Sequence, residues 1–242
     1  MKNKKPLFVV LALFLIGLIV WEVSARKSFL YAGTIEATEI DIAPRVASNI
    51  SKVFVQEGDL VKIGEPLAKL SCEDVKLDAQ LAQTDFNRIT RLFRKGSATQ
   101  EALDHTTNEY NQAMLRLNWC DIGSPMNATV LYRPRDPGDY VSVGETILTL
   151  ADLNSVYAYV YVPQPMLAKL SLGEKATGYL PELNRRAFPG HIEFIRPEAE
   201  FTPKNVQTEK ERSRLVFGIK VAFDNPQGIL KPGMPIEVRL GL

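Results

Sequence analysis

The chain contains one short phrase twice, and this repeat limits the folds that are open to it. Positions 57–70 read EGDLVKIGEPLAKL, and positions 137–150 read PGDYVSVGETILTL. Six of the fourteen aligned positions are identical, and both phrases place Gly-Asp and Gly-Glu pairs before an alternating apolar segment. Glycine adopts the positive φ of tight turns without steric cost, so each phrase predicts turns followed by a strand. Because each half alone is too small to bury a core, we predict one β-sandwich built from two related halves.

The segment between the two phrases has a different character. Neither 72–95 nor 97–120 contains glycine or proline, and Gly96 alone separates these two stretches. We therefore predict two helices, with Gly96 ending the first and either Ser97 or Thr99 capping the second. Mostly apolar residues recur along both helices with alternating spacings of four and three, which is typical of an antiparallel coiled-coil hairpin with arms about 35 Å long. These seam positions are Val75, Ala79, Ala82, Phe86, Ile89 and Phe93, then Leu103, Thr107, Tyr110, Met114 and Leu117.

The two cysteines occupy the two ends of the predicted hairpin. Cys72 begins the first helix and Cys120 follows the second, so an antiparallel hairpin brings both to its base. An isolated pair in an oxidising compartment favours a disulfide, and two buried free thiols are the alternative. In the chain-entropy model, a bridge that closes a loop of this length contributes roughly 4 kcal/mol to stability.

The amino terminus differs from the rest of the chain. Lysines precede an uncharged apolar run from Leu7 to Trp21, a pattern typical of a membrane-spanning segment whose N-terminus is cytoplasmic. Residues 1–27 are therefore interpreted as an uncleaved N-terminal transmembrane helix. A signal peptide cleaved near Val23-Ser24-Ala25 is the alternative.

Residues 151–242 are rich in predicted strands. Segment 155–162 alternates small apolar residues with tyrosine, as in a half-buried strand. One short helix is expected over 165–173, ended by Gly173, and the polar stretch 197–213 is expected to be an exposed loop. Several short strands with one helix suit a small antiparallel β-barrel. Besides 155–162, the predicted strands lie near 175–180, 187–195, 214–223 and 235–240.

Composition excludes several classes of function. The formal net charge is +1, and the aromatic residues are not interleaved with clustered lysine and arginine, so nucleic-acid binding is not expected. His105 and His191 lie in different predicted domains without companions of metal-ligand type. No nucleotide-binding or hydrolase motif occurs. We therefore predict neither an enzyme nor a bound cofactor or metal.

The split repeat, the hairpin and the following strands together resemble the HlyD-type membrane fusion proteins, the periplasmic adaptors of tripartite exporters. The closing stretch FTPKNVQTEKERSRLVFGIKVAFDNPQGILKPGMPIEVRL is similar to the last strands of the barrel in that family. The resemblance implies a mainly β fold with an inserted α-helical hairpin. A biotinyl/lipoyl-like sandwich would comprise 28–70 and 121–150, the hairpin 71–120 and the β-barrel 151–242.

The resemblance also implies partners. The chain would link an inner-membrane transporter to a TolC-type outer-membrane channel, for export of small toxic compounds or other cargo. It would be a single-pass inner-membrane protein of a Gram-negative cell, with its main body in the periplasm and its copies in a ring, by resemblance a hexamer. Many adaptors of RND pumps continue into a membrane-proximal domain, and its apparent lack after Leu242 favours an ABC-type transporter.

In the family, the hairpin tip meets the channel through an arginine, a leucine four residues later and a serine seven residues beyond that. Arg88, Leu92 and Thr99 fall at these spacings, with threonine replacing serine, and Gly96 lies between them. Leu92 follows one turn after Arg88 and points about 100° away from the seam, which suits contact with another protein. The alternatives are an ion pair of Arg88 with Asp85 and a purely capping role for Thr99.

Leu77 and Leu81 continue this second stripe towards the hairpin base. We expect them to pack against the hairpin of a neighbouring protomer, and the alternative is that they curl around the other helix of their own hairpin. Two other functions remain for comparison. One is a biotinyl or lipoyl carrier of an enzyme complex, which the missing lysine hairpin disfavours, and the other is an envelope scaffold that does not export.

Overall fold

The computed structural model of the 242-residue protein describes residues 29–201 and 215–241. They form two compact units, one comprising Ala37–Leu153 and the other the residues on either side of it. The expected membrane anchor, residues 1–27, lies outside the described residues. Among the described residues, no helix has the length and apolar character needed to cross a bilayer.

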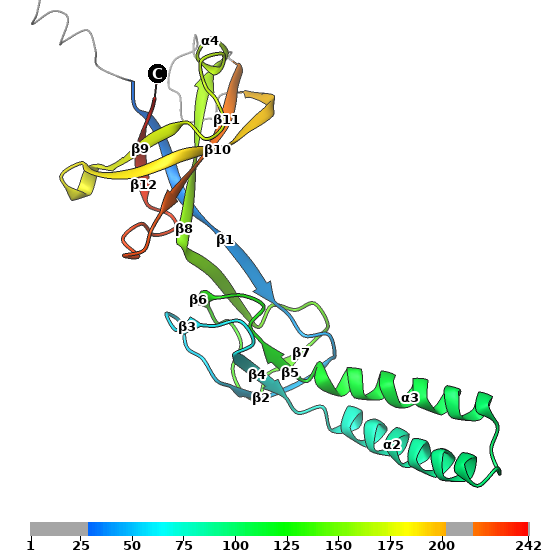
Figure 1. Ribbon diagram of the computed structural model, residues 1–242. Coiled ribbons are helices and arrows are strands. Elements are labelled where there is room, and N and C mark those ends of the chain that lie inside the picture. The colour runs from blue at the N-terminus through cyan, green and yellow to red at the C-terminus, as the bar shows by residue number, and fades with distance from the viewer. Residues whose placement is uncertain (1–28, 202–214, 242) are drawn as a thin grey trace, which may run out of the picture. The chain divides into compact units, whose positions relative to one another are not determined.

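The unit Ala37–Leu153 contains a β-sandwich and a helical hairpin (Figure 1). Its first sheet has the order β5-β4-β2-β7, and in its second sheet β6 pairs with both β3 and β8. All of these pairings are antiparallel. The strands are β2 (Ser48–Val53), β3 (Leu60–Val61), β4 (Pro66–Leu70), β5 (Asp121–Gly123), β6 (Ala128–Tyr132), β7 (Tyr140–Val141) and the start of β8 (Leu148–Pro163).

The two repeated phrases fold into matching halves that exchange hydrogen bonds. Gly58 donates its N–H to the carbonyl oxygen of Val130 at 2.8 Å, and Gly138 donates to that of Ile50 at 2.8 Å. Both glycines have positive φ, 92° and 100°. The inward apolar residues of both halves share one core, so the two halves form a single sandwich. The matched buried residues are Ile50, Val61, Leu67 and Leu70 in one half and Val130, Val141, Ile147 and Leu150 in the other.

The acidic residues of the repeat form its turns. The carboxylate of Asp59 accepts the backbone N–H three residues before it at 2.7 Å, and Asp139 does the same at 3.0 Å. Glu65 and Glu145 accept in the same way at 2.8 and 2.9 Å. Side-chain acceptors of this kind hold tight turns in place of a backbone partner. Four of the six identical positions, the two glycines, the aspartate and the glutamate, therefore form turns, and the other two, Val and Leu, belong to the shared core.

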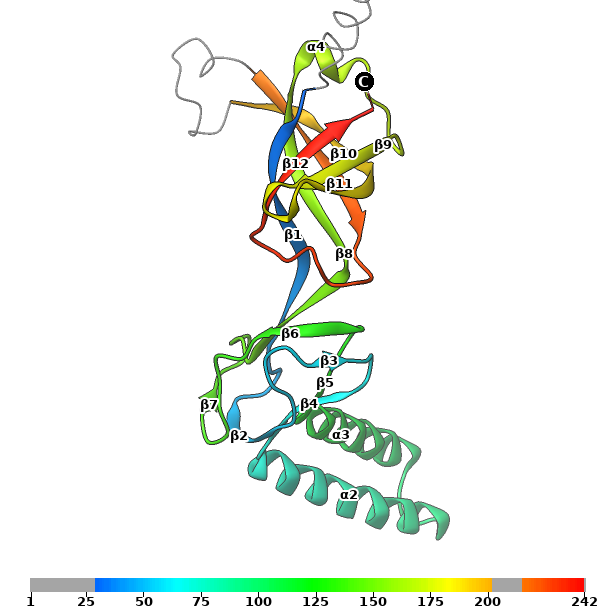
Figure 2. The ribbon, with the colours of Figure 1, turned by 90° about the vertical axis from the view of Figure 1, so that its left-hand side faces the viewer.

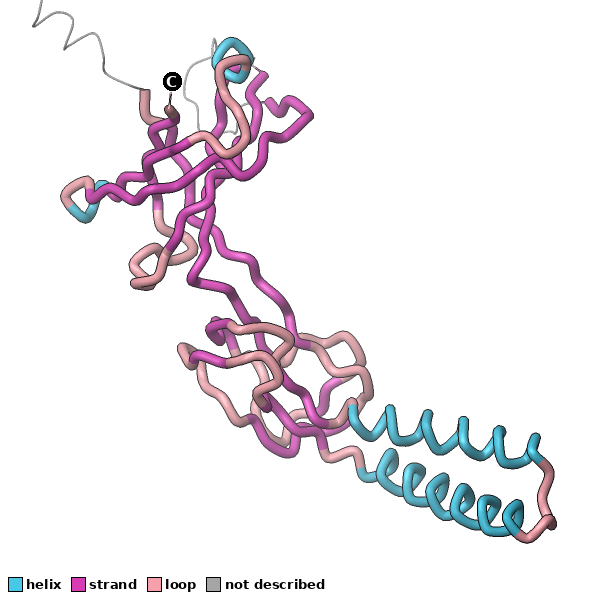
Figure 3. The backbone as a smooth tube through the Cα atoms, viewed as in Figure 1, coloured by secondary structure: helices cyan, strands magenta, loops and turns pink. Residues whose placement is uncertain are grey.

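The connection between the halves is the hairpin, which consists of α2 (Glu73–Arg94) and α3 (Gln100–Asn118) (Figure 3). The helices run antiparallel, and the predicted seam residues are buried or half-buried between them. The mainly β fold with inserted helices is thus confirmed.

The second unit is an antiparallel barrel with the strand order β1-β12-β9-β10-β11-β8, and pairing between β1 and β8 closes it (Figure 2). Apolar residues alternate inward along β8, where Val156, Ala158, Val160 and Val162 are buried. The one α-helix among its described residues is α4 (Gln164–Leu167). The strands are β1 (Tyr31–Ile42), the end of β8, β9 (Lys175–Leu180), β10 (Arg186–Phe201), β11 (Leu215–Asp224) and β12 (Pro235–Leu240), with a 3₁₀ turn at Pro181–Leu183.

Two expectations for this unit were wrong. The helix expected over 165–173 ends at Leu167, because the chain then enters a turn in which Ser171 donates its N–H to the carboxylate of Glu174 at 3.1 Å. The loop expected from residue 197 begins later, because β10 continues to Phe201 and pairs with β11. The remainder of that stretch, 202–214, lies outside the described residues.

Cations lie over tyrosine rings on the outer face of the barrel. The Lys220 ammonium is 4.1 Å from the centre of the Tyr157 ring, and the Arg196 guanidinium is 4.7 Å from that of Tyr159. Lys220 also donates to the carboxylate of Glu193 at 2.8 Å, and this hydrogen bond raises the pKa of Lys220 above its usual value. Burial raises the pKa of Tyr157. Both pKa shifts favour the protonated form, so Lys220 stays a cation and Tyr157 stays a neutral phenol at neutral pH.

Candidate functional site

The base of the hairpin is fixed to the sandwich covalently. Cys72 and Cys120 form a disulfide with their Cα atoms 6.2 Å apart, and both residues are buried. The N–H of Cys72 donates to Ser48 Oγ at 3.0 Å, and the N–H of Leu70 donates to the carbonyl oxygen of Cys120 at 2.8 Å. The start of α2 and the end of α3 are therefore tied to each other and to the sandwich core.

The two helices are joined along their length by the seam. The rings of Phe86 and Tyr110 stack with centroids 5.1 Å apart and an interplanar angle of 11°. Ala79 and Thr106 are buried between the helices. A helix pair that buries a continuous apolar seam behaves as one rod, and here the rod is also stapled at its base.

The tip of the hairpin satisfies its own backbone groups. Gly96 has a φ of 74°, and the N–H of Ser97 donates to the carbonyl oxygen of Leu92 at 2.8 Å, which is a Schellman end. Thr99 caps α3, since its hydroxyl oxygen accepts the N–H of Ala102 at 3.1 Å. These backbone groups are paired within the tip, so its exposed side chains are what it offers to a partner.

The structure places the predicted tip residues together in the outer half of the hairpin. The side chain of Arg88 is 61% exposed and pairs with Asp85 at 2.7 Å, the alternative that the sequence left open. Leu92, one turn further on, is 38% exposed. Exposed ion pairs are worth at most about 1 kcal/mol, so this pairing leaves Arg88 able to bind another protein. The docking role of Arg88, Leu92, Gly96 and Thr99 stays a prediction.

The second stripe points outward from the hairpin. Leu77 is 66% exposed and Leu81 is 63% exposed, so neither residue curls around α3. On α3, Leu115 is 52% exposed, and this residue was missed in the sequence. Its signal was its position between the seam residues Met114 and Leu117, which an amphipathic helix would normally fill with a polar residue.

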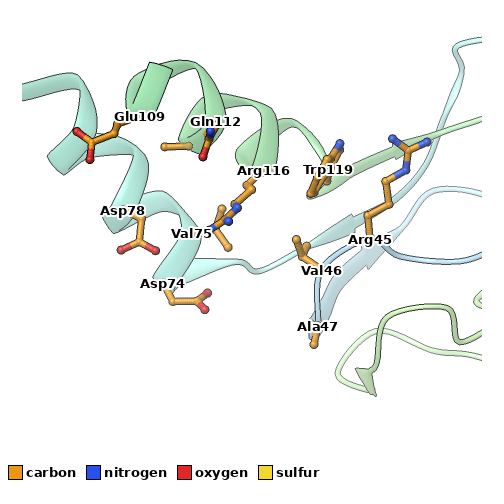
Figure 4. A pocket seen from close by; sticks show the side chains of 11 residues that line it. Arg45, Val46, Ala47, Asp74, Val75, Asp78, Glu109, Gln112, Arg116 and Trp119 are labelled. Carbon is orange, nitrogen blue, oxygen red and sulfur yellow. The ribbon is translucent and has the colours of Figure 1, made fainter. Parts of the chain in front are cut away.

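A depression of about 480 Å³ lies where the hairpin meets the sandwich (Figure 4). Asp74 and Asp78 of α2 and Arg116 of α3 line it together with Arg45 and Trp119. The Arg45 guanidinium lies 5.9 Å from the centre of the Trp119 ring. The lining thus carries both signs of charge, and within 29–201 and 215–241 no cluster of three acidic, histidine or cysteine side chains is suited to a metal ion.

Comparison with known proteins gives two family matches. Residues 38–152 match the CzcB-like barrel-sandwich hybrid domain, and residues 155–242 match the CusB-like β-barrel domain. A curated relative, the UPF0194 membrane protein in the asrC 5′ region of Acidithiobacillus ferridurans, is 41% identical over 119 residues, which are 49% of this chain and 35% of the relative. The chain therefore spans about a third of the length of such relatives.

Two solved structures have the same fold. One is the MacA–MexA chimeric protein with the Pseudomonas aeruginosa MexA α-hairpin domain, with a TM-score of 0.73 and 22% identity over 88% of this chain and 80% of the other. The second is the membrane fusion protein Spr0693 of Streptococcus pneumoniae R6, with a TM-score of 0.69 and 16% identity over 88% of this chain and 98% of the other. At these identities the likeness concerns the fold alone.

Proposed function

Given that the chain belongs to the membrane fusion, or adaptor, protein family, we propose that it is a periplasmic adaptor of an efflux-type export system. One observation carries this proposal: a helical rod, stapled by a disulfide at its base, presents satisfied backbone and exposed side chains at its tip. A hairpin of this kind acts as a mechanical link between two partners and does not catalyse a reaction. In this function the hairpin reaches towards an outer-membrane channel, while the rest of the chain serves the inner-membrane side.

The tip residues supply the contact with the channel. Arg88 presents a planar guanidinium with several donors, and Leu92 adds apolar surface one turn later. Arginine beside an apolar anchor is a common arrangement at the centre of protein interfaces. We propose that this pair, with the turn at Gly96 and the cap at Thr99, docks to a TolC-type channel.

The inner-membrane partner is a transporter, which supplies the energy for export. We propose an ABC-type transporter rather than an RND pump, on the resemblance of the sequence, with residues 1–27 as a single-pass anchor of the adaptor. Copies of the chain form a ring, by the same resemblance a hexamer, around the path of the cargo.

The test is co-purification from the envelope of the native host. The tagged full chain should bring down an inner-membrane transporter and an outer-membrane channel, each identified by mass spectrometry. The variants Arg88→Ala and Leu92→Asp should lose the channel and keep the transporter. The control Gln83→Ala changes an exposed α2 residue away from this face and should keep both partners. Retention of the channel by both tip variants would overturn the docking proposal.

Two further functions give different results in the same experiment. An envelope scaffold without export would bring down neither partner, and its deletion would leave tolerance to toxic compounds unchanged. A biotinyl or lipoyl carrier would have an intact mass above that of the unmodified chain. In a carrier of that kind the modified lysine lies on a tight hairpin between the two halves, a place that α2 and α3 occupy here.

A further inference from the structure

We propose that the outward face of α2 in one copy packs on the outward face of α3 in the next copy, with the two hairpins parallel and in register. This proposal rests on the ring in the proposed function and names the two surfaces that build it. The α2 face comprises Leu77, Leu81, Thr84 and Lys95, and the α3 face comprises Leu115, Gln112, Asn108 and Glu101.

The seam fixes which residues of the two helices lie at the same height. Phe86 and Tyr110 stack on each other and are therefore level. Both helices rise 1.5 Å per residue and run in opposite directions. Consequently Leu81, five residues before Phe86, is level with Leu115, five residues after Tyr110. By the same reasoning Lys95 is level with Glu101, one at each end of the tip turn.

The helical repeat fixes where these side chains point. At 100° per residue, Leu81 and Leu115 each lie about 140° from their stacked ring, in opposite senses about their helices. The two side chains therefore point away from the hairpin in opposite directions, and those of Lys95 and Glu101 do so as well. When a second copy lies alongside without changing orientation, its Leu115 faces Leu81 and its Glu101 faces Lys95.

The two faces are chemically complementary at three levels. Near the base an exposed leucine meets an exposed leucine, since Leu81 is 63% and Leu115 is 52% exposed. In the middle, Thr84 is level with Gln112. At the tip Lys95 meets Glu101, which are opposite charges. Apolar contact would thus supply most of the affinity, and the charged pair would fix the register.

Charge also decides between the two possible ways of pairing. If two copies met through the same face, as in a two-fold dimer, parallel hairpins would bring Lys95 against Lys95 or Glu101 against Glu101. Within one chain the described contacts of charged or polar hairpin side chains at ion-pair distance stay within a single helix: Arg88 pairs with Asp85 in α2, and His105 contacts Glu109 in α3. The opposite charges on the two faces are therefore arranged for a neighbour. Pairing of unlike faces leaves one face open at each end and closes into a ring.

The first experiment uses two variants of the full chain, purified in detergent and weighed by native mass spectrometry. Leu81→Glu damages only the α2 face, and Leu115→Glu damages only the α3 face. Each variant alone should be monomeric where the wild type is a ring, with an affinity at least about tenfold lower. An equimolar mixture should give dimers and no larger species, because one intact α2 face meets one intact α3 face.

The control Gln83→Glu adds the same charge to an exposed position of α2 that lies off the α2 face. It should assemble as the wild type does, and circular dichroism should show equal helix content for all four chains. A mixture of the two leucine variants that stays monomeric would overturn the proposal, and so would a wild-type chain that is monomeric at all concentrations.

The second experiment exchanges the charges at the tip. Lys95→Glu and Glu101→Lys should each weaken assembly about threefold, and the double exchange should restore it to within about twofold. No recovery in the double variant would refute the register. Co-purification tests the proposed function independently of these assembly experiments. A wild-type ring that brings down neither transporter nor channel would contradict the adaptor function and leave the pairing of faces intact.

Discussion

Gly58 and Val130 join the two halves of the sandwich through a 2.8 Å hydrogen bond from the glycine amide to the valine carbonyl oxygen. The φ of Gly58 is 92°, and an added Cβ would meet no atom within 4 Å. Gly58→Ala therefore adds backbone strain without a clash, and we expect a loss of about 1–2 kcal/mol in the free energy of unfolding. Urea unfolding followed by fluorescence measures this loss.

Gly123→Ala is the matched control in the same sandwich. Its Cβ would make contacts of 3.5 Å or more, and its φ lies outside the left-handed region. We expect it to be neutral or stabilising by about 0.4–1 kcal/mol. Equal losses in the two variants would show that φ at Gly58 is not the cause.

The disulfide at the hairpin base should carry much of the stability of its unit. Replacing both Cys72 and Cys120 by serine removes a cross-link between residues 48 apart in sequence, with an expected loss of about 3–4 kcal/mol. Both sulfurs are buried, at 0% and 2% residue exposure. Without denaturant, the native protein should therefore resist dithiothreitol, as judged by mass after alkylation. Rapid alkylation of the folded chain would contradict this.

The cap of α3 offers a graded test at the tip. Thr99→Ala removes the acceptor for the N–H of Ala102 and should cost about 1 kcal/mol, whereas Thr99→Ser keeps the oxygen and should cost little. If Thr99 acts only as a cap, Thr99→Ser should also retain the co-purified channel. Loss of the channel in the serine variant at unchanged stability would assign the methyl group to the interface.

Gly178 in the barrel has a packing requirement instead of a conformational one. An added Cβ would lie 2.5 Å from Ile236 Cδ1 and 2.8 Å from Phe223 Cε1. Gly178→Ala should therefore destabilise the chain by about 1–3 kcal/mol. Ile236→Val removes the offending Cδ1 atom, so the double variant should lose less than the sum of the two single losses. Strict additivity in thermal unfolding would exclude this contact as the cause.

The ammonium of Lys220 predicts a loss of stability at high pH. Its pKa is raised in the folded protein, first by the hydrogen bond to Glu193. A raised folded-state pKa gives a stabilising contribution that is complete below the ordinary lysine pKa and is lost as the pH rises through the folded value. The difference in unfolding free energy between wild type and Lys220→Met should be constant from pH 7 to about pH 9 and should shrink above about pH 10.5. A difference that shrinks at neutral pH would contradict this assignment.

The parts of the fold that local rules determine could be predicted from the sequence. Glycine turns and alternating apolar residues identified the two halves of the sandwich, and Gly96 with the four-three spacing identified α2 and α3 to within a few residues. A helix was expected where α4 lies, but its early end at Leu167 and the extension of β10 to Phe201 were missed, because a turn at Ser171 and pairing with β11 decide them and neither leaves a local pattern.

The candidate site was predictable only where a local sequence pattern marks its residues. Arg88 and Leu92 were found through the spacing of a family motif, and their exposure agrees with a binding role without testing it. Leu115 was missed because a single leucine beside a seam residue looks like part of the seam. Its outward direction becomes evident only when the stacking of Phe86 on Tyr110 sets the rotation of both helices.

The two ends of the hairpin leave the sandwich close together, and this has a consequence for how long the hairpin can be. The Cα atoms of Cys72 and Cys120 are only 6.2 Å apart, and beyond them Val75 and Leu117, at the base of the hairpin, still pack against the sandwich core. Seven extra residues in each arm would preserve the heptad and lengthen the reach by about 10 Å. The length of the hairpin can therefore change in steps of one heptad while the fold of the sandwich stays the same.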